Sequence, residues 1–335
     1  MPRIIAILLF AILPATLGHA GVERGYAHRE EVRLFAQAVA REKALPEDWI
    51  VRILGEARRR DSILKAMMRP AESKPWHEYR PIFVNPARID GGVAYWKNHA
   101  RLLAQVRERF GVDIPYIVAI IGVETRYGQH TGRYRVLDAL ATLAFDYPPR
   151  APFFRQELGE FLTLVHEEDI DPLSVKGSYA GAMGHGQFMP SSYRRYAVDF
   201  DGDGVRNLWD SDPDILASVA NYLHRHGWQA GGPVAVRARV QGEGWRPVLE
   251  AGMKPHLPLA ELTRLGVIPE GDDPIPGKEL ASLIRLQGEK APEYWVVFNN
   301  FHVITRYNRS PLYAMAVHQL AEAIREAYEE ESYSE

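Results

Sequence analysis

The stretch DIPYIVAIIGVETRYG, residues 113–128, decides the fold. Asp113 is a residue type that caps helix N-termini, and Pro115 suits a first helical turn. The seven residues before Glu124 are all apolar or glycine, which predicts a helix buried on every side. Gly128 is expected to stop this helix. The sequence therefore predicts a central buried helix with a carboxyl group near its C-terminal end.

Helical periodicity recurs on both sides of this stretch. Predicted helices cover residues 31–69, 93–110, 131–170 with a break at Pro148-Pro149, 213–227 and 311–330. Residues 76–92 are aromatic and close on Gly91-Gly92, which predicts an irregular segment. Residues 174–192 are rich in glycine and serine, which predicts a loop followed by a short helix after Pro190.

Residues 232–297 have a different character. They combine many prolines and glycines with short alternating runs, such as 234–240 and 294–297, which predicts a small β-containing insertion. The 335 residues are 46% hydrophobic and 25% charged, an ordinary globular composition that leaves room for about two domains. The predicted fold class is α+β and predominantly helical.

The first 20 residues are typical of a secretory signal peptide. Arg3 precedes an apolar run at 4–13 that is too short to span a bilayer, and Gly18-His19-Ala20 fits a cleavage site. We expect cleavage after Ala20 and a periplasmic mature chain without a transmembrane segment; an uncleaved anchor is the alternative. A net charge of −3 provides no basic field for nucleic acid. Because the chain has no cysteine, it forms no disulfide and carries no Cys-linked lipid.

Glu124 is the first candidate for chemistry. A carboxyl group at the end of an apolar helix is poorly solvated when ionised, which should raise its pKa. A raised pKa keeps a general acid protonated near neutral pH. The alternatives are a structural ion pair, for example with Arg126, or a carboxylate exposed beyond the buried turn.

A glycine-rich segment, SYAGAMGHGQFMPSS at 178–192, is the second candidate. Its glycines allow backbone to approach a ligand closely, and Ser178 and Gln187 offer neutral hydrogen-bonding groups that suit sugars. The segment lacks the closing Lys-Ser/Thr of a phosphate loop. An ordinary tight loop is the alternative. Residues 299–310 add the aromatic Tyr307 and amides, as carbohydrate sites do, although Ser310 before Pro311 also suits a helix cap.

The acidic loop, DFDGDGVRNLWD at 199–210, carries the D-x-D-x-D-G core of an EF-hand calcium loop. Its ligand positions fall on Asp199, Asp201, Asp203, the carbonyl of Val205, and Asp210. The last position is normally a longer glutamate, so Asp212 or Asp214 is an alternative to Asp210. We expect a structural calcium ion and no organic cofactor; a solvated acidic turn is the alternative.

Together these segments resemble the membrane-bound lytic transglycosylase B family. The matching motifs occur in the family's order, from about residue 76 to the C-terminal helix. They lie at residues 120–128 around Glu124, 180–192, 199–210, 218–223 around Tyr222, and 300–308, where Asn-Phe-x-x-Ile-x-x-Tyr-Asn ends in Tyr307 and Asn308. Five ordered matches are specific, whereas any one alone is not.

The resemblance implies cleavage of the MurNAc–GlcNAc bond of peptidoglycan glycan strands with 1,6-anhydro ends, with Glu124 as acid/base. It implies that the groove is lined by Tyr79, Arg150, Ser178, Gln187, Phe188, Tyr222, Tyr307 and Asn308. It also implies calcium in the acidic loop. Two departures qualify it: no cysteine is present for a lipid anchor, and Pro149 replaces the first of the family's paired arginines, which puts contacts to peptide stems in doubt.

The resemblance also implies a lysozyme-like core between a helical domain and a smaller β domain. The expected division is a helical domain at 21–110 joined by 311–330, a core at 111–231, a β domain at 232–298, and a groove segment at 299–310. Nothing in the sequence argues against a monomer. One rival is a goose-type lysozyme, which needs a second carboxylate from Asp138, Asp146 or Glu157, roughly 6.5–9.5 Å away for inversion. Another is a non-catalytic, calcium-stabilised peptidoglycan-binding protein.

Overall fold

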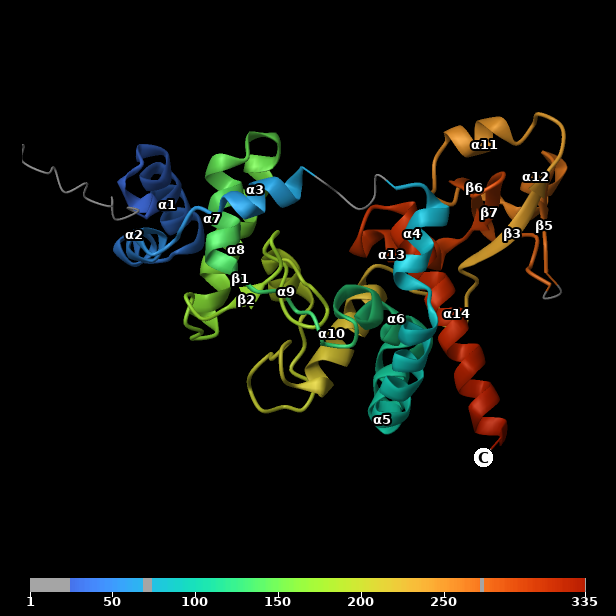
Figure 1. Ribbon diagram of the computed structural model, residues 1–335, viewed down its shortest axis with the longest axis horizontal. Coiled ribbons are helices and arrows are strands. Elements are labelled where there is room, and N and C mark those ends of the chain that lie inside the picture. Colours follow the sequence, from blue (N-terminus) through green and yellow to red (C-terminus); the bar gives the residue numbers. More distant parts are fainter. Residues whose placement is uncertain (1–24, 69–73, 272–273, 335) are drawn as a thin grey trace, which may run out of the picture.

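The computed structural model describes residues 25–68, 74–271 and 274–334, so the predicted signal peptide lies outside the described residues. Figure 1 shows an elongated arrangement, with N-terminal helices at one end, the helices around α6 in the middle, and a sheet at the other end. Within the described ranges, no helix is both long and apolar enough to cross a bilayer. The predicted fold class, α+β and mainly helical, is confirmed.

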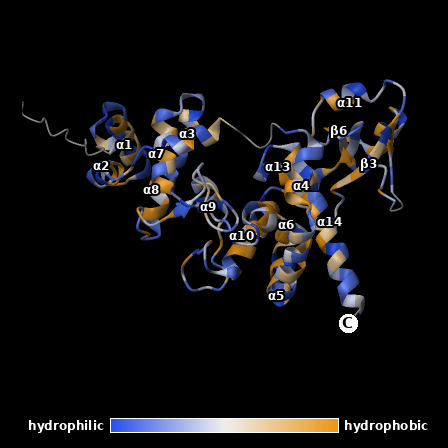
Figure 2. Ribbon diagram, in the orientation of Figure 1, coloured by the Kyte–Doolittle hydropathy of each residue, from blue (hydrophilic) through white to orange (hydrophobic). Residues whose placement is uncertain are grey.

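The N-terminal lobe begins with the short turn η1 (Tyr26–His28) and contains α1 (Glu30–Lys43), α2 (Glu47–Gly55), α3 (Asp61–Met67), α7 (Val136–Asp146) and α8 (Ala151–Glu167). The predicted helix at 31–69 is therefore three helices. Ala44 ends α1 in the left-handed region, with φ of 54°, and Pro46 directly precedes α2. The predicted break at 148–149 is the short turn η3 (Pro148–Arg150). Figure 2 shows hydrophobic and hydrophilic stripes side by side along the helices, as expected for helices with one buried face.

The middle of the molecule is built around α6 (Ile114–Thr125), which packs against α5 (Pro86–Phe110), α10 (Asp212–Arg225) and α14 (Pro311–Ser334). Every residue of α6 except Glu124 is buried, which confirms the predicted all-round burial. Two details differ. Asp113 occupies the cap position, but its carboxylate accepts from Trp228 Nε1 and Gly231 N instead of capping the helix. The helix also ends at Thr125, before Gly128.

The prediction of an irregular segment at 76–92 is wrong. The chain forms α4 (Trp76–Phe83) and the start of α5, which Asn85 caps through its side chain. Gly91 and Gly92 lie inside α5. A Cβ added at Gly92 would lie 2.4 Å from Ile324 Cδ1, so this glycine lets α14 approach α5 closely and does not end a helix.

The predicted β-containing insertion is a five-stranded antiparallel sheet in the order β4-β6-β7-β3-β5. Its strands are β3 (Ala235–Val240), β4 (Leu257–Pro258), β5 (Val267–Pro269), β6 (Leu280–Gln287) and β7 (Pro292–Val297), with helices α11 (Arg246–Glu250) and α12 (Leu259–Arg264). The sheet has its own apolar cluster, which includes Trp245, Leu262 and Val296.

Three short elements lie around the glycine-rich segment. Strand β2 (Lys176–Gly177) directly precedes the segment and pairs with β1 (Tyr134–Arg135). Helix α9 (Pro190–Tyr196) begins at its end, as predicted. The predicted groove segment at 299–310 is mostly a helix, α13 (Asn299–Tyr307). The Ser310 side chain then accepts from Tyr313 N, as expected of a cap for α14.

A buried polar cluster lies where the N-terminal end of α6 meets α14. The Tyr116 hydroxyl contacts His318 Nδ1 at 2.9 Å and donates to Glu322 Oε1 at 3.2 Å. Burial lowers the pKa of His318, with Glu322 acting to raise it and Arg325 to lower it. His318 is therefore harder to protonate in the folded protein than in the unfolded chain.

This cluster predicts a loss of stability in acid. A histidine with a lowered folded-state pKa binds its proton more readily when unfolded, so stability declines as pH falls below about 6.5. Between pH 6.5 and 5.5, we expect the free energy of unfolding to fall by up to about 1.4 kcal/mol per pH unit from this residue. Denaturant titrations measure it. The slope should flatten in His318→Asn and persist in His256→Asn, an exposed control; an unchanged slope in His318→Asn contradicts the prediction.

Candidate active site

Glu124 meets α14 at the end of α6. The Tyr313 hydroxyl donates a hydrogen bond of 2.6 Å to Glu124 Oε1. Burial raises the pKa of the Tyr313 phenol well above its ordinary value, and the negative charge of Glu124 raises it further. Tyr313 therefore remains a protonated donor at neutral pH. The pair holds the carboxyl group in a defined orientation.

Aromatic rings surround this pair. Tyr307 lies nearly parallel to Tyr313, with ring centroids 6.5 Å apart, and Tyr222 lies 4.7 Å from Tyr307. Phe188 completes the group at 5.6 Å from Tyr222 and 5.8 Å from Tyr307. Burial raises the pKa of Tyr307, and the charge of Glu124 adds to this effect. The structure thus brings four of the sequence-predicted residues together.

The glycine-rich segment supports these rings through its backbone. The carbonyl of Gly186 accepts a 2.6 Å hydrogen bond from the Tyr307 hydroxyl. A Cβ added at Gly186 would lie 3.0 Å from that hydroxyl, so a larger residue would force the Tyr307 hydroxyl to shift slightly. Gly181 and Gly184 have φ of 84° and 68°, a region that glycine adopts readily.

Two polar side chains of the segment have fixed positions. Gln187 itself has a positive φ of 49°, and its Nε2 donates to the carbonyls of Thr131 and Gly184. The Ser178 hydroxyl accepts from the backbone N–H groups of Ala180 and Ala182. Both side chains are therefore preorganised, as a binding loop requires.

The remaining groove candidates are placed less directly. Tyr79 is buried beside Trp76 and Phe83. Asn308 follows the end of α13. Arg150 is exposed, and its guanidinium stacks 4.5 Å from the centroid of Phe153, so its contacts are with α8 and not with the rings around Glu124.

The acidic loop gathers three carboxylates. Ligand atoms of Asp199, Asp201 and Asp203 all lie within 4.8 Å of one another. The Asp199 carboxylate also accepts from the N–H groups of Gly202 and Gly204, which closes the loop on itself. A set of hard oxygen donors at this spacing fits Ca²⁺.

Asp210 and Asp214 are both candidates for the loop's last position. Both are outside the group of three carboxylates whose ligand atoms lie within 4.8 Å of one another. Asp214 accepts from the N–H groups of Phe200 and Asn207 at 2.8 Å each, so it bridges both sides of the loop. Burial raises its pKa, and the charges of Asp201 and Asp199 add to the effect. Val205 is exposed, and its N–H donates to Asp203.

The carboxylates that a hydrolase would need have structural partners. Asp138 binds Arg60 and Arg135, Asp146 binds Arg29, and Glu157 accepts from both the N–H and the hydroxyl of Ser191. Burial raises the pKa of Glu157, which the bonds from Ser191 counteract.

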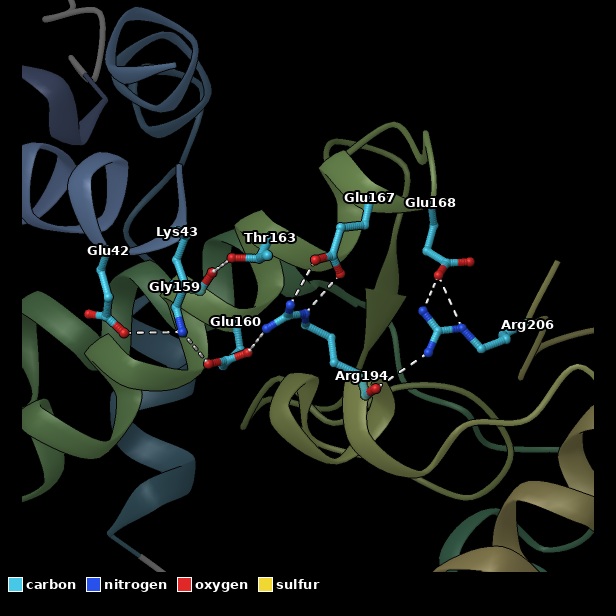
Figure 3. Close-up of polar contacts among 9 residues, drawn as sticks. All are labelled: Glu42, Lys43, Gly159, Glu160, Thr163, Glu167, Glu168, Arg194 and Arg206. Atoms are coloured by element: carbon cyan, nitrogen blue, oxygen red, sulfur yellow. Dashed lines mark hydrogen bonds and ion pairs between the residues drawn. The ribbon is translucent and has the colours of Figure 1, made fainter. Parts of the chain in front are cut away.

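An ion-pair network ties the loops of the site to the N-terminal lobe (Figure 3). Lys43 of α1 binds Glu160 of α8 at 2.8 Å, and Glu160 also binds Arg194 of α9. Burial alone would raise the pKa of Glu160, but the two cations lower it. Arg206, inside the acidic loop, binds Glu168 just after α8.

Tyr313, which donates a hydrogen bond to Glu124, is a candidate-site residue that the sequence analysis did not predict. It lies in the predicted C-terminal helix, where an aromatic residue is normally part of the core. Its proximity to Tyr307 in sequence was a weak signal. The contact with Glu124 spans 189 positions, so only the packing of α14 on α6 reveals it.

This fold and site define a class of enzyme. The transglycosylase SLT domain family matches residues 27–322, and the chain belongs to that family. The chain is 42% identical over 309 residues to membrane-bound lytic murein transglycosylase B of Escherichia coli K12, covering 89% of this chain and 84% of that protein. It is a lytic transglycosylase, an enzyme that cleaves peptidoglycan.

Solved structures of relatives agree. The soluble lytic transglycosylase SltB1 of Pseudomonas aeruginosa superposes with a TM-score of 0.82 at 48% identity, over 89% of this chain and 99% of that one. E. coli Slt35 in complex with calcium gives 0.79 at 40%, over 92% and 98%. P. aeruginosa SltB3 in complex with NAG-anhNAM-pentapeptide gives 0.77 at 34%, over 88% and 79%.

Proposed function

We propose that Glu124 is the single acid/base group of the reaction, which cleaves the MurNAc–GlcNAc bond and leaves 1,6-anhydro ends. The observation that carries this proposal is the Glu124–Tyr313 hydrogen bond at the end of a buried helix, beside Tyr307. Tyr313 fixes Oε1, so Oε2 is the atom from which we expect the proton to be donated.

The reaction follows from one carboxyl group acting twice. Protonated Glu124 donates to the glycosidic oxygen, the C1–O bond breaks, and positive charge develops on the MurNAc ring. The 2-acetamido group of the substrate can stabilise this charge, in place of the second carboxylate that most glycosidases use. Glu124 then accepts the proton of the C6 hydroxyl, whose oxygen attacks C1 and closes the anhydro ring. No water is consumed.

The neighbouring side chains suit a sugar strand. Aromatic residues such as Phe188, Tyr222 and Tyr307 provide apolar surface, and Ser178 and Gln187 provide neutral polar groups. We extend the site to Tyr79 and Asn308, which lie close to these residues in space or in sequence. A relative's complex with NAG-anhNAM-pentapeptide supports a ligand of this kind. Arg150 contacts α8, so we assign it at most to the peptide stem.

The test is the mass of the products released from purified sacculi. A transglycosylase leaves anhydro ends, which lack one water relative to the reducing ends left by a hydrolase. We expect anhydro muropeptides alone. Reducing ends as the main product would favour the goose-type lysozyme reaction, with Asp138, Asp146 or Glu157 as the first residues to test.

We also propose that the acidic loop binds one Ca²⁺ for stability, through Asp199, Asp201, Asp203 and the carbonyl of Val205, with Asp214 in preference to Asp210. The calcium complex of Slt35 supports this assignment. When bound, the ion would neutralise carboxylates that otherwise repel one another.

Calcium should therefore raise the melting temperature. Binding to the folded state alone stabilises by about 2.7 kcal/mol at a free concentration 100 times the Kd. Thermal unfolding with calcium, with magnesium and with a chelator measures the effect. The double variant Asp199→Asn/Asp203→Asn keeps acceptor oxygens but removes two charges, and it should no longer respond. A melting temperature that ignores millimolar calcium contradicts the assignment.

We place the enzyme in the periplasm, where its substrate lies, delivered by the N-terminal segment. Release of this segment should leave a mature chain beginning at Gly21. N-terminal sequencing of the exported protein tests the placement.

A further inference from the structure

The helix α6 ends in an unusual turn directly after Glu124. Arg126, Tyr127 and Gly128 all have positive φ, of 52°, 58° and 84°. Two of these residues carry side chains, for which the left-handed region is unfavourable. Such a turn persists only when surrounding contacts hold it, so the contacts of Thr125, between Glu124 and the turn, are informative.

Thr125 holds both sides of this turn with one hydroxyl. Its side chain is 1% exposed. Oγ1 accepts from Gly128 N at 3.0 Å, which closes the turn. The same hydroxyl points to the carbonyl of His185 at 3.0 Å and to that of Ile121 at 3.2 Å.

The bond to His185 connects the turn to the glycine-rich segment, next to Gly186 and Gln187. His185 lies next to Gly186, whose carbonyl holds Tyr307, and two residues before Gln187. Its own N–H donates to the carbonyl of Leu208 in the acidic loop, at 2.9 Å. The His185 ring also lies against the turn, because a Cβ added at Gly128 would come within 2.4 Å of His185 Cε1.

We propose that Thr125 is a positioning residue for catalysis, which fixes the carboxyl group of Glu124 relative to the sugar-binding segment around Gln187. This inference rests on the proposed role of Glu124. Thr125 does not touch the substrate. Its hydroxyl sets the distance between two parts of the site that lie about 60 residues apart in sequence.

The experiment compares three variants of the full chain. Thr125→Val keeps the shape but removes the hydroxyl, Thr125→Ser keeps the hydroxyl, and Thr163→Val is the control. Thr163 is also buried, and its hydroxyl donates to the carbonyl of Gly159 at 2.8 Å on α8 (Figure 3), so the control loses an equivalent bond elsewhere.

We expect Thr125→Val to lower kcat by about 10- to 100-fold on a soluble GlcNAc–MurNAc strand, because small misplacement of a catalytic group is costly. KM should change little. Thr125→Ser should retain kcat within about threefold, since it keeps the donor and acceptor. Thr163→Val should lose stability without losing kcat. Each protein is assayed below its own melting temperature, and Thr125→Ala replaces the valine variant if the latter does not fold.

Three results would overturn the inference: normal kcat in Thr125→Val, equal losses in the serine and valine variants, or an equal loss in Thr163→Val. Failure of the proposed function is seen separately. It would appear as activity in Glu124→Gln or as reducing ends from the unmodified enzyme, neither of which depends on Thr125.

Discussion

Replacing Glu124 by glutamine should abolish turnover while leaving the fold and sugar binding largely intact. Glutamine fills the same volume and still accepts the Tyr313 hydrogen bond at its carbonyl oxygen. It cannot donate an acidic proton or take one up. General acid–base catalysis is worth on the order of 10²–10⁴-fold, and here the same group serves both steps. Release of anhydro muropeptides from sacculi, followed by mass, measures the loss.

The matched control is Glu322→Gln. Glu322 also accepts a hydrogen bond from a buried tyrosine, Tyr116, but near the other end of α6. This variant should alter stability and leave the products unchanged. If Glu124→Gln works at the normal rate, or if the control loses as much activity, Glu124 is not the acid.

Replacing Tyr313 by phenylalanine should lower kcat/KM by about 10- to 100-fold. As the proton leaves Glu124, negative charge develops on the carboxylate, and the Tyr313 hydroxyl stabilises it. Hydrogen bonds to charged groups are worth about 1.5–3 kcal/mol, which corresponds to this range. Because the bond favours the ionised form, its loss should also move the alkaline limb of the pH–rate profile to higher pH.

Tyr116→Phe is the control for this variant. It removes a buried, hydrogen-bonded tyrosine hydroxyl from the same α6–α14 contact, at a distance from Glu124 along the helix. Loss of rate in Tyr116→Phe as large as in Tyr313→Phe would mean that helix packing, and not the bond to Glu124, controls the rate. An unshifted pH profile in Tyr313→Phe would argue against the electrostatic role.

The sequence predicted those parts of the fold whose cause is local. The apolar run before Glu124 and the alternating runs at 232–297 each specify their own structure. It failed at Gly91-Gly92, because inside α5 Gly91 lies against the ring of Tyr127 and Gly92 lets Ile324 of α14 approach closely. Paired glycines occur both in loops and at close contacts between helices, and only the tertiary structure distinguishes the two cases.

The candidate site divides in the same way. Glu124 and the glycine-rich segment stand out by composition, and the acidic loop by spacing. Tyr313 and Thr125 do not, because their contacts are with partners 189 and 60 positions away. Arg150 shows that a motif match can also mislead. The resemblance implied that it lines the groove, but its guanidinium stacks on Phe153 of α8.

The position of Tyr313 on the last helix has a consequence for the cell that makes this enzyme. A growing chain already contains Glu124, but it lacks the tyrosine that binds this residue until α14 has been made and has docked. Proteolytic fragments that end before this helix are likewise incomplete. The bonded pair of Glu124 and Tyr313 can therefore form only when nearly the whole polypeptide has been made.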